Sequence, residues 1–419
     1  MDFWESDDLA AHRDAARAWA DANVRPEWAA EQVRTGCHQT PELHARLAGD
    51  GILGAGWPPE YGGTDVDLDF ARAVFDELAR RGVEADGWST TSMVAHTILQ
   101  VATEEQKHAY IPAVLRGEML IALGYSEPDS GSDVAAAKTT AVPVPSDGTG
   151  APPGGTGAGG TGAGGDWVIN GQKMFTSTAQ LASHVFVLAR TNPDVPKHKG
   201  LTLFLVPTAS EGYACQPIYT LGGQVTNATF YAGVRVPDRA RIGGVDEGWS
   251  VMKVALVYER GFGSSTSLEQ TLARDLAAWA RAARRPDGTA VFDDPLTAER
   301  IGRMAVDEEV TRVMSLRLGW LAQRGELPQV EGSMRKLFWT ETIQRHYSDA
   351  LDILGADGVL APGAAGAPGA AAASGAPAGG EFEHDFRAAV VTTVYGGASE
   401  ILREIIAERR LGLPRNRRA

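Results

Sequence analysis

A polar segment that follows an apolar stretch carries residue types that could hold a ligand. Residues 123–133 read LGYSEPDSGSD, a turn-forming run. Such a loop offers serine hydroxyls and backbone N–H groups, which can hydrogen-bond the polar edge of a ring-shaped ligand. The same composition also suits an ordinary turn. The residues of this segment alone leave both interpretations open.

The spacing of apolar residues differs between three stretches of the chain, and the elements that these stretches predict must position this loop. Up to about residue 120, apolar residues return at helical spacing, as in 9–24 and 70–79. Between 121 and 240 the pattern is short apolar runs typical of strands, and the NG pair at 170–171 is a turn signal that closes one of them. Helical spacing resumes from Trp249 onward, in the stretches 249–283, 297–323, 334–354 and 399–411. We therefore predict an α+β multidomain chain with an all-α N-terminal domain (1–120), a β domain (121–240) and an α-helical C-terminal domain (241–419).

Composition excludes several classes of function. A net charge of -14 disfavours nucleic-acid binding, because phosphate backbones attract an excess of Lys and Arg. Apolar runs stop short of the roughly 20 residues that span a bilayer, so no membrane insertion is expected. The acidic start of the chain lacks the order of a secretory signal, and two distant cysteines, Cys37 and Cys215, suit a reducing compartment better than a disulfide scaffold or a cysteine metal site. We expect a cytoplasmic protein without a metal ion.

The loop at 123–133 resembles the flavin signature of the acyl-CoA dehydrogenase family, which is usually Thr-Glu-Pro followed by Gly-Ser-Asp. The chain is similar to this family through most of its length, in the same order. The other matching segments are GWPPEYGG at 56–63, TEEQK at 103–107, NGQK at 170–173, VRVP at 234–237 and YGGASE at 395–400. The resemblance implies a central β-barrel or sandwich, a C-terminal four-helix bundle and FAD as the cofactor.

Within the signature loop, the resemblance assigns roles to individual residues. Ser126 stands where the family places a hydroxyl that faces the flavin pyrimidine edge, and Tyr125 and Gly131 belong to the same cofactor-binding loop. Serine in place of threonine keeps that hydroxyl. Ser132 matches the position that contacts the CoA part of the substrate.

A second segment, KMFTS at 173–177, matches the part of the family that lies against the flavin ring. Phe175 falls at the flanking aromatic residue, and Ser177 falls at the hydroxyl that hydrogen-bonds near N5. A donor there would stabilise charge that develops on the reduced ring. The alternative for Phe175 is an ordinary core position.

The reaction that the resemblance implies removes an α proton from an acyl thioester while the β hydrogen leaves as hydride to the flavin. It requires a carboxylate in a water-poor cleft, where the proton affinity of the carboxylate rises. Many members supply that base directly after the tyrosine that matches Tyr395, but this chain has Gly396 there. A subset places its Glu on the first long helix of the C-terminal domain, where this chain has Glu259. Gly396 is left with a backbone N–H that could hold the thioester oxygen.

The expected helix around Glu259 has a suitable spacing. Trp249, Met252 and Leu256 recur at three- and four-residue intervals along one apolar stripe, and Glu259 is its next position. A helical Glu at the edge of such a stripe can also be solvated or paired with a cation. Arg260 would orient Glu259, meet CoA or form a structural salt bridge.

The resemblance weakens where the family binds flavin across a subunit boundary. The turn at 284–288 reads RRPDG and lacks the family's aromatic residue, and 354–358 reads LGADG. Arg274 on the preceding helix is our candidate to compensate, and Ser399 and Glu400 remain available for polar contacts with the cofactor. These departures leave a hetero-oligomer with a paralogous partner open beside a homo-tetramer or homo-dimer.

The sequence is compatible with three functions. The first is dehydrogenation of an acyl-CoA, or of a carrier-protein thioester, with an electron-transferring flavoprotein or similar acceptor. The others are a flavin-dependent monooxygenase on the same fold, since fold does not fix chemistry, and a partly active subunit of a mixed complex. His96 is either a residue of the acyl cavity or a satisfied helix residue. The Gly/Ala/Pro-rich stretches at 143–165 and 361–380 are expected to be mobile surface loops.

Overall fold

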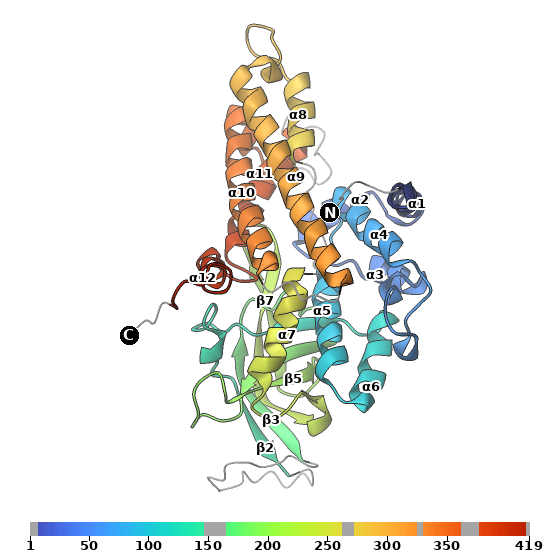
Figure 1. The fold of residues 1–419 in the computed structure, drawn as a ribbon, viewed down its shortest axis with the longest axis vertical. Helices are drawn as coiled ribbons and strands as arrows, with labels where there is room; N and C mark the ends of the chain where they lie inside the picture. Colours follow the sequence, from blue (N-terminus) through green and yellow to red (C-terminus); the bar gives the residue numbers. More distant parts are fainter. Residues whose placement is uncertain (1–6, 146–164, 262–271, 325–329, 362–376, 416–419) are drawn as a thin grey trace.

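The computed structural model describes residues 7–145, 165–261, 272–324, 330–361 and 377–415, with the backbone alone at 7–8, 259–261 and 322–323. Most of the two predicted surface loops lies outside the described residues. The described chain has helices first, strands next and helices last (Figure 1), which confirms the predicted fold class. None of the described helices combines the length and apolar character that a membrane span requires.

Amphipathic helices form the N-terminal part of the described chain. Asp67 caps one of them through its carboxylate, which accepts the N–H groups of Asp69 and Phe70 at 2.8 and 3.0 Å. The helices are α1 (Asp7–Asn23), α2 (Glu27–Thr35), α3 (Pro41–Gly49), α4 (Leu68–Arg80), α5 (Asp86–Val101) and α6 (Glu104–Leu115).

Thr103 and Gln106 fix the start of α6 and join it to the β domain. They form a capping box, in which each side chain bonds the other residue's backbone N–H. The Gln106 amide also donates to the carbonyl oxygens of Arg239 and Arg241, at 2.9 and 2.6 Å. The TEEQK segment is therefore a joint between two domains.

The strands form one eight-stranded sheet in the order β6-β7-β3-β2-β4-β5-β8, and β1 pairs with β4 in parallel. β4 and β5 are apolar over most of their length and lie in the interior. The buried polar side chain of β5, Thr202, is satisfied because its hydroxyl accepts the N–H of Asp246 at 2.9 Å. The strands are β1 (Ile121–Gly124), β2 (Thr140–Val144), β3 (Asp166–Lys173), β4 (His184–Arg190), β5 (Leu201–Pro207), β6 (Tyr213–Tyr219), β7 (Val225–Pro237) and β8 (Arg241–Ile242).

The predicted turn at Asn170-Gly171 is wrong. β3 continues through both residues to Lys173, and the register with β7 shifts between Ile169 and Gly171, as in a β-bulge. Gly171 has a φ of +146°, and a Cβ there would lie 2.5 Å from the Thr139 hydroxyl oxygen. Glycine is thus needed for a close approach within the sheet.

The C-terminal helices divide into a connecting helix and a bundle. α7 (Gly248–Gly261) packs against α5 and β5, and residues of all three elements share one apolar core, as Ile98, Leu203 and Met252 illustrate. A second apolar core fills the bundle, which rises away from the sheet in Figure 1. The remaining helices are α8 (Leu272–Ala282), α9 (Pro295–Gln323), α10 (Glu331–Leu354), α11 (Glu381–Ala389) and α12 (Ser399–Arg409).

Gly36 ties the end of α2 to the turn between β6 and β7. It adopts a φ of +66°, and its carbonyl oxygen accepts the N–H of Val225 at 2.8 Å. A Cβ at this position would lie 2.2 Å from the Gly223 carbonyl oxygen, a contact that backbone atoms cannot relieve by a rotamer change. This close approach holds the N-terminal helices beside the β domain.

We expect Gly36→Ala to lower the free energy of unfolding by about 3 kcal/mol, because the new methyl group adds a backbone clash to an unfavourable φ. Gly82→Ala is the matched control, since Gly82 has a φ of +69° but the nearest atom to its added Cβ is 3.6 Å away. The control should lose only about 1 kcal/mol. Urea unfolding of both variants measures the difference, and equal losses would show that the approach to Gly223 does not matter.

Candidate active site

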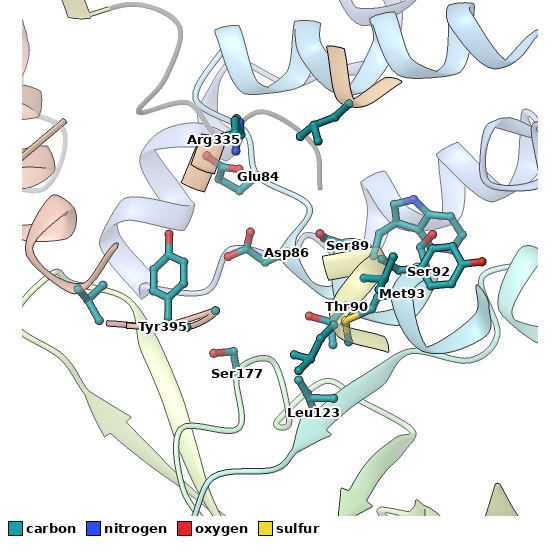
Figure 2. Close-up of a pocket in the computed structure, with 18 of the residues that line it drawn as sticks. Glu84, Asp86, Ser89, Thr90, Ser92, Met93, Leu123, Ser177, Arg335 and Tyr395 are labelled. Carbon is teal, nitrogen blue, oxygen red and sulfur yellow. The ribbon is translucent and has the colours of Figure 1, made fainter. Parts of the chain in front are cut away.

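A cleft of about 2790 Å³ lies where the three domains meet. Its walls come from α4 and α5, the loop after β1, the segment after β3, α7, α9, α10, α11 and α12. Figure 2 shows this space from inside, with Ser177, Tyr395 and Asp86 on different sides of it. Helices and strands far apart in sequence thus present their side chains to a single cavity.

The predicted signature loop forms one wall of the cleft. Glu127 and Ser130 close it as a tight turn by exchanging backbone hydrogen bonds of 2.9 and 3.1 Å. Five of its residues line the cleft, namely Leu123, Tyr125, Ser126, Gly131 and Ser132. The loop therefore presents hydroxyls and backbone to the cavity, as its composition predicted.

A buried ion pair holds the signature loop on the end of β3. The Lys173 ammonium group, 0% exposed, donates to the Glu127 carboxylate at 2.8 Å and to the Tyr125 carbonyl oxygen at 3.2 Å. The carboxylate also accepts the N–H groups of Lys138 and Thr139. Burial lowers the pKa of Lys173 to about 8, although the carboxylate opposes this shift. Burial would raise the pKa of Glu127, but the ammonium group and the two N–H donors outweigh it and hold that pKa below its usual value.

The segment that follows Lys173 presents an aromatic ring to the same cleft. Phe175 has 61% of its surface exposed, which excludes the core position left open by the sequence. It adopts a φ of +58°, an unfavourable conformation for a bulky residue. The chain holds it there because Met174 N–H bonds the Ser126 carbonyl oxygen and Thr176 N–H bonds that of Asn227. An exposed ring in a strained, anchored segment suits stacking against a planar ligand.

Ser177 also lines the cleft, and its hydroxyl lies 3.3 Å from the Thr226 hydroxyl. Between this hydroxyl and the signature loop, the cleft offers an aromatic face, hydroxyl groups and backbone N–H groups. These groups fit an isoalloxazine ring, which needs a flat apolar contact and polar partners at its edge. They are the residues of this chain that would hold FAD.

Phe175→Ala is expected to weaken FAD binding by about tenfold, because it removes a stacking surface worth about 1 kcal/mol or more. Fluorescence titration of the apoprotein with FAD measures the dissociation constant without requiring turnover. Tyr219→Ala is the control, since Tyr219 is an 80% exposed aromatic residue that does not line the cleft. Equal affinity of the two variants would remove Phe175 from the flavin site.

The apolar stripe predicted on α7 faces the cleft. Trp249, Met252 and Leu256 all line it, and so do Val257 and Tyr258. The backbone of Glu259 continues the same helix, while its side chain and that of Arg260 lie outside the described part of the chain. The role of Glu259 as the base therefore stays a prediction, made on a helix whose preceding turn lines the cavity.

The turn before α12 forms the wall that contains Tyr395. Tyr395 and Gly396 line the cleft, and Gly396 has a φ of +60°. Lys336 on α10 supports this turn, because its ammonium group donates to the carbonyl oxygens of Thr392 and Gly397 at 3.1 and 2.9 Å. The backbone of Gly396 is thereby held in place beside the cavity.

Three predicted cofactor residues are not among the described residues that line the cleft. Arg274 lies on α8 and pairs with Asp275 at 2.8 Å. Ser399 is buried at the start of α12 and Glu400 is exposed beside it. In this single chain they are separate from the group around Phe175, so their contact with FAD stays a prediction.

His96 is both a cleft residue and a satisfied helix residue. Its ring lies 4.0 Å from that of Trp57 and 5.0 Å from that of Tyr258, measured between centroids, and its Nδ1 lies 2.8 Å from the Ser92 carbonyl oxygen. Burial lowers its pKa. The GWPPEYGG loop thus reaches the cleft wall through Trp57, which packs on His96.

Two residues of the cleft were missed by the sequence-based prediction. Asp86 begins α5, and its side chain keeps 46% of its surface exposed while lining the cleft. Partial burial in the cleft, and then the charge of Glu84, raise the pKa of this carboxyl group above its usual value. His38 lies 3.6 Å from it, and burial, followed by the charge of His384, lowers the pKa of His38 to about 4. No local pattern signalled either residue, since each is brought to the cleft by tertiary packing.

The fold and the cleft define the class of protein: a helix–sheet–helix chain that can hold a planar cofactor between its domains. Domain profiles cover most of the chain, with "Acyl-CoA dehydrogenase, N-terminal domain" at 6–118, "Acyl-CoA dehydrogenase, middle domain" at 122–231 and "Acyl-CoA dehydrogenase, C-terminal domain" at 246–411. The chain belongs to the acyl-CoA dehydrogenase family. It is therefore an oxidoreductase of a family of FAD-binding flavoproteins, which confirms the resemblance.

Individual relatives cover nearly the whole chain. "Acyl-CoA dehydrogenase FadE26" of Mycobacterium tuberculosis is 32% identical over 384 residues, 90% of this chain and 88% of the relative. "Acyl-CoA dehydrogenase IpdE1" of the same organism is 31% identical, with 97% and 98% coverage. Among solved structures, "Tcur3481-Tcur3483 steroid ACAD" matches with a TM-score of 0.83 at 32% identity, covering 99% of this chain and 100% of the other. The "ChsE4-ChsE5 complex from Mycobacterium tuberculosis" matches with the same TM-score and coverage at 30% identity.

Proposed function

We propose that this protein is an FAD-dependent dehydrogenase that converts an acyl-CoA thioester to its trans-2-enoyl-CoA. The observation that supports this most is the convergence on one cleft of the signature loop, Phe175, the α7 stripe and Gly396. Each of these features was assigned to the same reaction from the sequence. They come from four separate segments of the chain.

In this proposal each side of the cleft has its own task. Glu259 removes the α proton, and the apolar stripe before it keeps water away and raises the proton affinity of the carboxylate. The backbone N–H of Gly396 holds the thioester oxygen and so acidifies the α carbon. Ser126 and Ser177 orient the cofactor, and bound FAD would take up the β hydrogen as hydride.

The substrate that we propose carries a bulky ring system. One solved relative, named as a steroid ACAD, is 32% identical over 99% of this chain. A cleft of about 2790 Å³ exceeds the roughly 300–1,000 Å³ of an ordinary small-molecule pocket, which leaves room for a cofactor and a large acyl group together.

We also propose a multimeric enzyme that passes electrons to an electron-transferring flavoprotein or a similar acceptor. Two similar structures are named as pairs of different chains, Tcur3481-Tcur3483 and ChsE4-ChsE5. The departures at 284–288 and 354–358 lie where the family completes its flavin site from an adjacent subunit. Both observations favour a hetero-oligomer.

The test is anaerobic mixing of the flavin-loaded protein with a panel of acyl-CoA thioesters, including linear, branched and steroid-derived acyl groups. We expect the flavin band at about 450 nm to bleach with at least one ring-bearing thioester. Flavin that stays oxidised with every thioester, while the reduced protein consumes oxygen and hydroxylates an added substrate, would favour the monooxygenase. Flavin that is retained only beside a co-expressed paralogue would identify a subunit of a mixed complex.

A further inference from the structure

The proposed base stands in the last turn of its helix. α7 ends at Gly261, and Glu259 lies two residues before that end. The last four carbonyl groups of a helix have no partner within it, so this turn opens more easily than the middle of the helix. A catalytic group has to be held within about 0.5 Å of its working position. The end of α7 therefore needs support from the rest of the fold if Glu259 is to act as the base.

Tyr258, the residue directly before Glu259, joins this last turn to α5. The two helices lie side by side (Figure 1). The Tyr258 ring stacks on that of His96, with 5.0 Å between the centroids and 29° between the planes. Burial raises the pKa of Tyr258, and a hydrogen bond with the Gln100 side chain opposes this shift. Two side chains of α5 thus hold one ring of α7.

His96 is itself held from two sides. Its Nδ1 lies 2.8 Å from the Ser92 carbonyl oxygen, which can only accept, so Nδ1 carries the proton and donates it. On its other side the imidazole packs against Trp57, with 4.0 Å between the centroids. Trp57 is only 7% exposed and belongs to the apolar core of the N-terminal helices. Trp57, His96 and Tyr258 therefore form one aromatic stack that runs from this core to the end of α7.

The GWPPEYGG loop fixes the first member of the aromatic stack. The N–H of Trp57 bonds the Gly54 carbonyl oxygen at 3.2 Å, and the N–H of Gly63 bonds that of Pro58 at 3.1 Å. A Cβ at position 63 would lie 1.9 Å from the Trp57 carbonyl oxygen, so only glycine allows the loop to fold back on itself here. This loop belongs to the family resemblance, and the site as described so far gives it no task. Holding Trp57 in place provides one.

We propose that the aromatic stack of Trp57, His96 and Tyr258 positions Glu259 for removal of the α proton. This inference rests on the proposed function and adds positioning residues to its base. Trp57 and His96 reach the base through Tyr258, whose backbone is joined directly to that of Glu259. Burial lowers the pKa of His96, so its ring is neutral at pH 7 and adds no positive charge beside the base. The effect of His96 on Glu259 is therefore one of position.

The experiment measures the rate constant of flavin reduction by the acyl-CoA that reacts with the wild-type protein, under anaerobic single-turnover conditions. His96→Leu should lower it by about 10- to 100-fold, because a displacement of about 1 Å can cost that much. The dissociation constants of the thioester and of FAD should change by less than about threefold. His96→Phe keeps a ring but no nitrogen and should stay within about threefold of the wild-type rate. Equal losses in both variants would contradict a role of the ring itself.

His108→Leu is the matched control. His108 on α6 also has its Nδ1 near the carbonyl oxygen four residues earlier, at 2.9 Å from that of Glu104. Its ring also contacts the GWPPEYGG loop, at 5.0 Å from that of Tyr61. It is exposed and is not among the described residues that line the cleft. The control should reduce flavin at the wild-type rate.

Coupling to the base separates positioning from a general structural role. In the Glu259→Gln background, His96→Leu should slow flavin reduction by no more than about twofold further, because no base is left to position. A residue that only stabilises the fold would slow the reaction by the same factor in both backgrounds. Tyr258→Leu breaks the stack from the side of α7 and should show the same loss and the same coupling. Urea unfolding and FAD titration identify the variants that are folded.

The outcomes distinguish this inference from the proposed function. If no thioester bleaches the flavin, the proposed function fails, and the inference falls with it. If Glu259→Gln bleaches at the wild-type rate, the base lies elsewhere and the stack positions nothing. If Glu259→Gln is slow but His96→Leu and Tyr258→Leu are fast, or are slowed equally in both backgrounds, the dehydrogenase stands and the role of the aromatic stack is overturned.

Discussion

Glu259→Gln is expected to slow the reduction of bound flavin by acyl-CoA by about 10³-fold, within the range that a positioned general base contributes. Glutamine has nearly the shape of glutamate but cannot take up a proton. Binding of FAD and of the thioester should change little, so the loss should appear in the rate of bleaching rather than in the substrate concentration at half-saturation. Stopped-flow absorbance under anaerobic conditions separates these two quantities.

Glu309→Gln is the matched control for this variant. Glu309 also lines the cleft, but it is exposed and pairs with Arg312 at 2.7 Å on the same helix. The control should bleach at the wild-type rate. A Glu259→Gln variant that also bleaches at that rate would place the base elsewhere, since Gly396 has no side chain to supply it.

A carboxylate introduced at position 396 provides a second test of Glu259 as the base. Gly396→Glu in the Glu259→Gln background restores a carboxylate at the position used by many members of the family. Its φ of +60° makes any side chain there unfavourable by about 1–2 kcal/mol, so rescue should be partial. Recovery of even about tenfold in bleaching rate would show that both positions reach the same α carbon.

The sequence predicted the features that are local in the chain. The α–β–α order follows from apolar periodicity, and the family match rests on continuous segments such as 123–133 and 173–177. The cleft-facing stripe on α7 followed from the spacing of Trp249, Met252 and Leu256, which the fold confirms. These features could be predicted because neighbouring residues determine them.

The features that were missed depend on contacts between distant segments. Asp86 and His38 are polar residues in unremarkable surroundings, and only packing of the α2 loop against α5 brings them together. The sequence predicted a turn at Gly171, but glycine is required there because the backbone approaches Thr139. This approach joins separate segments, so no local pattern could predict it. Their roles depend on the folded environment, which shifts the pKa of a carboxyl group or excludes a Cβ.

Lys173→Met is expected to lower the free energy of unfolding by about 3–5 kcal/mol, the usual effect of removing one partner from a buried ion pair. Among the described residues, the Glu127 carboxylate would stay buried with two N–H donors but without a cation hydrogen-bonded to it. Lys138→Met is the matched control, since Lys138 pairs with Asp129 of the same loop at 2.8 Å, but both side chains are 73% exposed. The control should lose less than about 1 kcal/mol.

Urea unfolding followed by circular dichroism measures both variants, and fluorescence titration with FAD gives a second result. Because Lys173 also bonds the Tyr125 carbonyl oxygen, its loss should loosen the signature loop and weaken FAD binding in protein that is still folded. The double variant Lys173→Met/Glu127→Leu removes the unpaired carboxylate, so it should regain part of the free energy of unfolding. It should not regain the affinity for FAD, because neither side chain of the ion pair is left to hold the loop. Equal losses in Lys173→Met and Lys138→Met would mean that the buried pair does not hold the loop. The backbone hydrogen bond between Met174 and Ser126 would then be the contact to test next, because it also joins the two walls of the proposed flavin site.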